Sequence, residues 1–346
     1  MMALLHFGYK RSNGMQFIIL LGLLLVVLWG SLLVGSVELS LTKIINQLFN
    51  MPFLPNFEAS IEATIVWSIR LPRILTAACV GAALAVAGAQ MQSLLQNPLA
   101  SPGLLGSSSG AALGAVMAIT WGWASWAVWA LPVMAVVGAF VALFVVYALS
   151  VRHGRASVMT LLLAGIAVNA FIGALTSLVI TLVWQDYEMA GQIIFWLLGS
   201  LESRTWLHVL LVAPAVIIGV GVAMLYAREL DIFLMGQETA ESLGVATESI
   251  HRIILLNTAL LTGCAVAVSG VIGFVGLIIP HLVRMFWGPR HRYLLPICAI
   301  MGAIFLVLMD TLARTLLSPQ EIRIGILTAL LGAPFFLFLL LRQREF

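Results

Sequence analysis

The sequence has 346 residues, of which 62% are hydrophobic and only 9% are charged, with a mean hydropathy of +1.10. A soluble domain is about 45–50% apolar and roughly 25% charged, so this composition excludes a soluble enzyme, a disordered chain, a disulfide scaffold and a nucleic-acid-binding protein. Because one membrane crossing takes about 20 apolar residues, it predicts an all-α, polytopic membrane protein.

Ten apolar spans follow one another along the chain, separated by charged or Pro/Gly-rich breaks. The expected crossings are residues 16–37, 74–95, 104–120, 128–150, 158–183, 206–227, 252–270, 271–287, 294–316 and 324–341. The seventh and eighth form one unbroken run, and a single helix of that length would measure about 54 Å against a hydrocarbon core of about 30 Å. Ser269-Gly270 and Gly273 offer a turn, so we expect two short helices there and one ten-helix transmembrane domain over residues 1–346.

Basic residues favour one orientation of these crossings. With the N-terminus inside, eleven lysines and arginines lie on inner segments and six on outer ones, which agrees with the positive-inside rule. The inner residues are Lys10, Arg11, Arg152, Arg155, Arg228, Arg252, Arg284, Arg290, Arg292, Arg342 and Arg344, and the outer ones are Lys43, Arg70, Arg73, Arg204, Arg314 and Arg323. Eight of the ten tryptophans fall near the outer face, as an interfacial belt does. We therefore expect both termini inside.

Two segments that lie 182 residues apart resemble each other. GAALAVAG at 81–88 is followed ten residues later by Pro98, and GCAVAVSG at 263–270 is followed ten residues later by Pro280. Five helices separate the two starts, so the copies would run antiparallel, as in the inverted repeats of transporters. Small residues also gather wherever membrane helices pack closely, so the pattern predicts an inverted repeat without excluding simple close packing.

The region from residue 70 to 106 combines charge, small residues and chain breaks. It reads RLPR at 70–73, GAALAVAGAQMQSLLQ at 81–96 and NPLASPGLLG at 97–106. Arg70 and Arg73 lie at the outer mouth of a helix, where they could anchor to lipid phosphate or pair with carboxylates on an external partner. Asn97-Pro98 and Pro102 break the chain at the inner face, which is tolerated at a membrane boundary or beside a water-filled path.

The long inner segment from Arg228 to Arg252 carries five acidic residues among apolar ones and is punctuated by Gly236 and Gly244. This pattern predicts two short amphipathic helices outside the membrane, with apolar residues left to contact a cytoplasmic partner; an ordinary solvated loop is the alternative. The sequence has no GxxxxGK[ST] phosphate-binding loop. Any ATP hydrolysis is therefore expected on another subunit, with no cofactor on this chain.

The segment from 70 to 106 closely resembles the permease family of ABC importers for vitamin B12, ferric siderophores and haem, the FecCD-type iron-chelate permeases. Further matching segments are LLLAGIAVNA (161–170), LGSL (198–201), MGQETAESLGV (235–245), GVIGFVGLIIPHLVR (270–284), MDTLAR (309–314) and GILTALLGAPFF (325–336). The chain departs from the family pattern at Met235, where leucine is usual, and at Arg323, where proline is usual.

The resemblance implies the permease subunit of an ATP-driven importer, not itself an enzyme, which carries an iron chelate (ferric siderophore or haem) or cobalamin across a bacterial inner membrane. The implied partners are a second permease subunit, with a homodimer favoured, two cytoplasmic ATPase subunits that hold ATP and Mg, and a periplasmic or lipoprotein-tethered binding protein. The chain would also contact membrane lipid, and no nucleic acid.

The resemblance also implies roles for single positions. Arg70, Arg73 and Arg314 match arginines that dock the binding protein, although Asp310, one turn before Arg314, could pair with it instead. The coupling-helix loop is expected at about 229–250. Its expected ATPase contacts are Leu234, Gly236, Ala240, Leu243 and Gly244. Asn97 and Leu99 match positions that constrict the path at its cytoplasmic end; simple helix termination is the alternative.

Other functions are weighed by the residues they need. No metal site is expected, and His281 is interpreted as a structural hydrogen-bonding residue. An ion-coupled secondary transporter is the alternative function; it would need a carboxylate deep in the bilayer, and Asp310 is the only acid within a span. An intramembrane enzyme lacks a plausible nucleophile–base pair.

Overall fold

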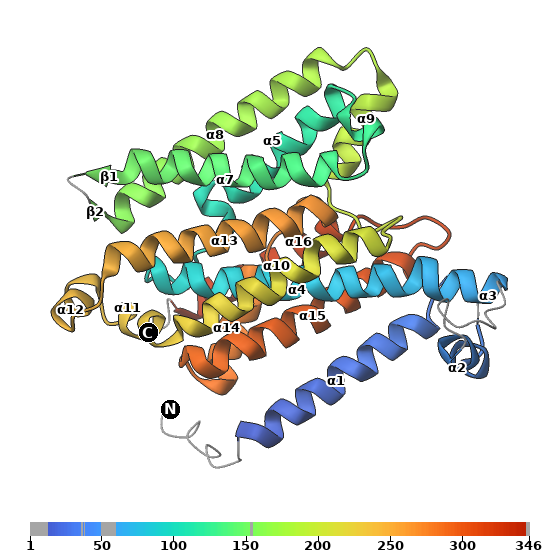
Figure 1. The fold of residues 1–346 in the computed structure, drawn as a ribbon, viewed down its shortest axis with the longest axis horizontal. Helices are drawn as coiled ribbons and strands as arrows, with labels where there is room; N and C mark the ends of the chain where they lie inside the picture. Colours follow the sequence, from blue (N-terminus) through green and yellow to red (C-terminus); the bar gives the residue numbers. More distant parts are fainter. Residues whose placement is uncertain (1–12, 36, 38, 50–59, 153–154, 344–346) are drawn as a thin grey trace.

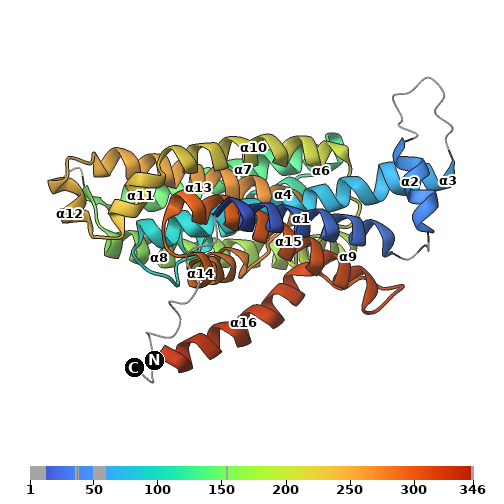
Figure 2. The same ribbon diagram turned by 90° about the horizontal axis from the view of Figure 1, so that it is seen from below.

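The computed structural model describes residues 13–35, 37, 39–49, 60–152 and 155–343, and it shows a bundle of long helices (Figures 1 and 2). The apolar helices are α1 (Asn13–Leu33), α4 (Leu71–Leu94), α5 (Ser107–Thr120), α7 (Ala130–Ser150), α8 (Val158–Leu182), α10 (Trp206–Leu225), α13 (Thr247–Ser269), α14 (Val275–Trp287), α15 (His291–Thr315) and α16 (Ile324–Gln343). Seven are long and apolar enough to cross a membrane, and α5, α14 and the described part of α16 are shorter. The predicted all-α membrane fold is confirmed.

Short elements join these helices at the two ends of the bundle. They are α2 (Leu41–Phe49), α3 (Ile61–Thr64), the π-helix η2 (Ile65–Arg70), the 3-10 helix η3 (Pro102–Leu105), α6 (Trp123–Trp126), α9 (Tyr187–Leu197), α11 (Ala227–Phe233), α12 (Gln237–Ser242) and the antiparallel two-residue strands β1 (Val151–Arg152) and β2 (Arg155–Ala156). We call the end with β1, β2, η3, α11 and α12 the α12 end, and the end with α2, α3, α6 and α9 the α2 end (Figures 1 and 2).

Helix α4 is the centre of the packing. Twenty of its 24 residues are buried, and it contacts α10, α13, α14 and α15. At two crossings the backbones meet directly: Gly81 faces the Gly302 carbonyl on α15, and Gly88 faces the Gly276 carbonyl on α14. Small residues permit such close approach between membrane helices, which gain van der Waals contact there.

The predicted break between the seventh and eighth crossings falls at residues 270–274. Gly270 (φ 69°) and Phe274 (φ 66°) both adopt positive φ, and a Cβ at position 270 would clash with the Trp196 carbonyl oxygen. The turn is anchored because the Ser200 amide donates a 2.8 Å hydrogen bond to the Ser269 carbonyl. The predicted break is therefore present, but only the second helix is short: α13 has 23 residues and α14 has 13.

The order of helix lengths is similar in the two halves of the chain. Long α4 is followed by a break and short α5, and long α13 is followed by a break and short α14. Helices α4 and α13 also contact each other and run in opposite directions between the two ends (Figure 1). This arrangement agrees with an inverted repeat, which stays a prediction.

We expect Gly88→Ala to destabilise the protein, because the new methyl group would clash with the Gly276 carbonyl. Overpacking of this kind costs about 1–3 kcal/mol. Gly22→Ala in α1 is the matched control, since its Cβ would meet no atom within 4 Å and alanine favours a helix over glycine. Unfolding in mixed detergent micelles measures both variants, and equal stabilities would contradict the close backbone contact.

Candidate functional site

A buried network of charges lies at the α2 end, where α4 begins and α15 ends. Arg73 Nε donates to Asp310 Oδ1 and Oδ2 at 2.9 and 3.1 Å, and its Nη1 and Nη2 donate to Glu321 Oε1 and Oε2 at 2.9 and 2.8 Å. One guanidinium therefore holds two carboxylates through charge-assisted hydrogen bonds: Glu321 in the two-nitrogen, two-oxygen geometry, and Asp310 through the shared Nε. Partial burial works against the charged Glu321, but the hydrogen bonds and charge of Arg73 outweigh it and hold the pKa of Glu321 below its usual range.

The other two arginines of this network bind α1. Arg70 donates to the carbonyls of Leu32, Leu33 and Val37, and Arg314 donates to Ser31 O and Oγ at 3.1 and 2.8 Å. We call Arg70, Arg73, Asp310, Arg314 and Glu321 the arginine network. It ties α1, α4, α15 and the segment before α16 together.

The three predicted docking arginines are therefore brought together, but they face inward. Arg70, Arg73 and Arg314 are only 4%, 7% and 8% exposed. The alternative pairing is present, because Arg314 Nε lies 3.4 Å from Asp310 Oδ2. Contact with a binding protein stays a prediction. The sequence interpretation missed Glu321 as a partner, although it is the sole acid in the loop after α15.

A fourth arginine, Arg204, lies beside the network. Its Nη1 is 3.0 Å from His208 Nε2, while its buried Nε has no hydrogen-bond partner. Burial and the nearby charge of Arg73 lower the pKa of Arg204 to about 10. The α2 end thus holds more buried positive than negative charge.

Arg323, which replaces the usual proline, forms a clasp at the same end. Its Nη1 lies 2.8 Å from Glu202 Oε2 and 3.2 Å from Ser200 Oγ, and its guanidinium stacks 4.6 Å from the centre of the Phe195 ring. The clasp joins the start of α16 to the loop that follows α9.

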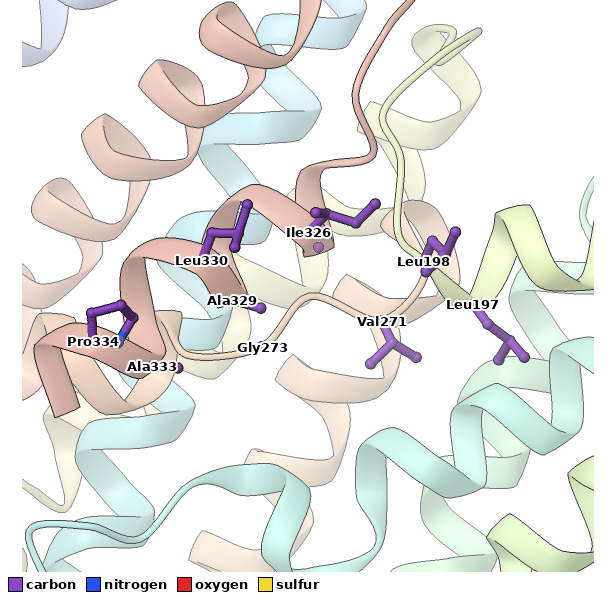
Figure 3. A pocket seen from close by; sticks show the side chains of 10 residues that line it. Leu197, Leu198, Val271, Gly273, Ile326, Ala329, Leu330, Ala333 and Pro334 are labelled. Carbon is purple, nitrogen blue, oxygen red and sulfur yellow. The ribbon is translucent and has the colours of Figure 1, made fainter. Parts of the chain in front are cut away.

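An apolar cavity of 610 Å³ is lined in part by Leu198 and by Ile326 of α16 (Figure 3). It lies between α16, the end of α9 and the turn at 270–274, and its lining residues are Leu197, Leu198, Val271, Gly273, Gly325, Ile326, Ala329, Leu330, Ala333 and Pro334. None of them carries a charge. The lining side chains offer apolar contact, and none of them carries the oxygen, nitrogen or sulfur donors that a bare metal ion prefers.

His281, interpreted from the sequence as a structural residue, lies in α14. Its ring packs edge-on against Phe335, with 6.4 Å between ring centres. In the part of the chain that the structure describes, no group of three His, Cys, Asp or Glu side chains is placed to hold a metal ion.

The predicted pair of short helices is present at the α12 end as α11 and α12, which with the following turn form the α11–α12 segment (residues 227–245). Leu230, Phe233 and Ala240 are fully buried against the bundle. Leu234, Met235 and Leu243 are 41%, 68% and 61% exposed. Gly236 (φ 105°) and Gly244 (φ 79°) make the turns. Of the predicted ATPase contacts, Leu234 and Leu243 are thus accessible and Ala240 is not.

The predicted gate residues form a compact turn after α4. Asn97 Oδ1 accepts a 2.9 Å hydrogen bond from the Leu99 amide, and its carbonyl accepts one of 3.0 Å from the Ala100 amide. Gln96 precedes this turn at φ 49°. The geometry is that of helix termination, the alternative noted from the sequence, and a gating role stays a prediction.

Comparisons with known proteins agree with this architecture. The FecCD transport family matches residues 23–342. The chain is 43% identical to the hemin transport system permease protein HmuU of Yersinia pestis, over 94% of this chain and 95% of that one. It is 45% identical to the cobalamin import system permease protein BtuC of Halobacterium salinarum, over 81% of this chain and 74% of that one.

A solved structure described as an inward-facing conformation of a candidate metal-chelate type ABC transporter is also similar. It has a TM-score of 0.82 and 33% identity, and the match covers 95% of this chain and 99% of that one.

We expect Asp310→Asn to destabilise the protein by about 3–5 kcal/mol, because it leaves buried Arg73 and Arg314 with too little negative charge. Glu62→Gln is the matched control: the Lys43–Glu62 pair at 3.0 Å has side chains 59% and 32% exposed, and such surface pairs contribute at most about 1 kcal/mol. Unfolding in mixed micelles measures both. If the two losses were equal, the network would not hold these helices together.

Proposed function

The chain belongs to the FecCD transport family, and we propose that it is the permease subunit of an ABC importer that carries a bulky iron chelate, such as a ferric siderophore or haem, or cobalamin. The observation that carries this proposal is the similarity, over nearly the whole chain, to permeases named for hemin and cobalamin import. The apolar cavity supports it, since its wall suits the organic shell of a chelate better than a bare ion.

The orientation follows from charge. Among the described residues, eight arginines lie at the α12 end and six basic residues lie at the α2 end. The first set is Arg152, Arg155, Arg228, Arg252, Arg284, Arg290, Arg292 and Arg342, and the second is Lys43, Arg70, Arg73, Arg204, Arg314 and Arg323. Lys10, Arg11 and Arg344, which were assigned to the inner face, lie outside the described residues. By the positive-inside rule we place the α12 end and both termini in the cytoplasm of a bacterial cell, with the chain in the inner membrane.

The α11–α12 segment is the proposed contact for the ATPase subunits. Its exposed Leu234, Met235 and Leu243 stand on the cytoplasmic side, where apolar side chains outside a membrane indicate a protein partner. Hydrolysis of ATP, with its Mg, is assigned to those partners.

A second permease subunit is proposed beside α16, and a homodimer is favoured. Figure 2 shows α16 standing away from the rest of the bundle, and Leu330, Leu331 and Leu337 on it are at least half exposed. The apolar cavity lies on this open side. A second copy of the chain facing it would close two such cavities into one path.

The binding protein is proposed to dock at the α2 end. Arg70, Arg73 and Arg314 stay the candidate docking residues, but a carboxylate of the partner would have to compete with Asp310, Glu321 and the carbonyls of α1. Charge reversal of Arg70 and Arg73 must therefore be scored both for binding-protein affinity and for stability of the permease. Loss of stability with unchanged affinity would remove the docking role.

The importer reconstituted in liposomes with its ATPase subunits and binding protein tests the proposed function. Uptake of ferric siderophore, haem and cobalamin should need ATP and the binding protein and should withstand a proton or sodium ionophore. Uptake that persists without ATP and collapses with the ionophore would instead show the ion-coupled transporter.

We expect Leu243→Glu to reduce recovery of the ATPase subunits with the purified permease by about tenfold or more, because a buried apolar anchor contributes at least about 1–2 kcal/mol to an interface. Gln320→Glu, at an exposed position in the loop after α15 at the opposite end of the bundle, is the control and should change recovery less than twofold. Equal recovery of both variants would place the ATPase contact elsewhere.

A further inference from the structure

A chain of buried polar side chains joins the α11–α12 segment to the last turn of α4. His291, the first residue of α15, is at its centre, and its side chain is fully buried. Its Nδ1 lies 2.6 Å from Asp231 Oδ1 on α11, and its backbone amide donates to the same oxygen at 2.9 Å. On the other side of the ring, Nε2 lies 2.5 Å from Ser93 Oγ on α4.

A second group holds the same turn of α4. Arg284 on α14 donates to Gln92 Oε1 and lies within 3.4 Å of Ala89 O and 3.5 Å of Ser93 Oγ. The Gln92 carbonyl accepts a 3.0 Å hydrogen bond from the Asn97 amide. The end of α4 and the turn of Asn97 and Leu99 are therefore one hydrogen-bonded unit, which is fixed to α14 and α15.

The imidazole is the only side chain in this chain of contacts that touches both sides. Asp231 is partly exposed, with 37% of its side chain accessible, whereas Ser93 is fully buried. Partial burial disfavours the charged form of Asp231. The hydrogen bonds from His291 outweigh this effect and hold the pKa of Asp231 below its usual range. The Asp231 carboxylate thus stays ionised and keeps its hydrogen bonds to His291.

We propose that His291 is a positioning residue that carries a displacement of the α11–α12 segment to the end of α4 and the turn of Asn97 and Leu99. The inference rests on the proposed function, in which ATPase subunits move this segment. Because the ring is rigid and fully buried and both of its nitrogens are engaged, the segment and the end of α4 must move together or break a short hydrogen bond. Breaking one leaves a buried polar group unpaired, which is costly.

Two substitutions separate the two halves of the link. His291→Asn places its amide near the position of Nδ1, so it can keep the hydrogen bond to Asp231 and loses the one to Ser93. The side-chain amide of His291→Gln reaches the position of Nε2, so it can keep the hydrogen bond to Ser93 and loses the one between the side chain and Asp231. The matched structural control is His251→Gln: His251 is buried beneath the same segment, with its ring 4.9 Å from that of Phe233, but within the described part of the chain it makes no hydrogen bond to α4.

The test is uptake per ATP hydrolysed by the complete importer in liposomes, beside the amount of assembled complex. For His291→Asn and His291→Gln we expect assembly and ATP hydrolysis within about threefold of the unmodified protein, and uptake per ATP lower by about tenfold or more. His251→Gln should lower thermal stability and leave uptake per ATP unchanged. If uptake per ATP is unchanged in the His291 variants, or falls equally in all three, the proposal is overturned.

A measurement without transport keeps this inference separate from the proposed function. Asp231→Asn and Ser93→Ala are made singly and together, first with His291 present and then in the His291→Asn background. In each background, the shift in melting temperature of the double variant is compared with the sum of the two single shifts. The two side chains meet only through His291, so their shifts should fail to add when His291 is present and should add when it is asparagine. Additive shifts in both backgrounds would overturn the link even if the importer works as proposed.

Discussion

Direct contact between backbones along α4 is the constraint on which the rest of the structure depends. Lipid tails are as apolar as leucine, so apolar helices gain little from leaving lipid for one another, and close approach must supply the attraction. Gly81 against Gly302 and Gly88 against Gly276 supply it. With α4 and α15 held antiparallel at this distance, the start of one helix meets the end of the other at both faces of the bundle.

The two polar clusters are consequences of that alignment. At the α2 end Arg73 reaches Asp310, and at the α12 end Ser93 reaches His291. Charged and polar groups inside a membrane protein are expensive unless they find partners, and here Arg73 and Ser93 each find one on α15. The same helix pair therefore carries a buried link on the side proposed for the binding protein and another on the side proposed for the ATPase.

The sequence predicted the elements of the fold and offered the Asp310–Arg314 pairing that the structure shows, but it did not predict the partners of Arg73. Apolar length defined ten crossings, and Ser269-Gly270 and Gly273 located the break that the structure shows at 270–274. Glycine spacing likewise predicted α11 and α12. The partners of Arg73 could not be predicted in this way, since Asp310 follows it by 237 residues and only packing decides which side chains meet. An arginine at a membrane face therefore suggested an external partner, whereas the chain supplies its own carboxylates.

The separation of Arg73 from Asp310 also has a consequence for biosynthesis. A ribosome adds about 5–20 residues per second, so α4 enters the bilayer roughly 10 to 50 s before the carboxylate that pairs with it has been made. During that interval the guanidinium must rest at the lipid headgroups or be shielded by insertion machinery. Closure of the arginine network is thus among the last steps of maturation, and a nascent chain stalled before residue 310 would display an unpaired cation that membrane quality control could recognise.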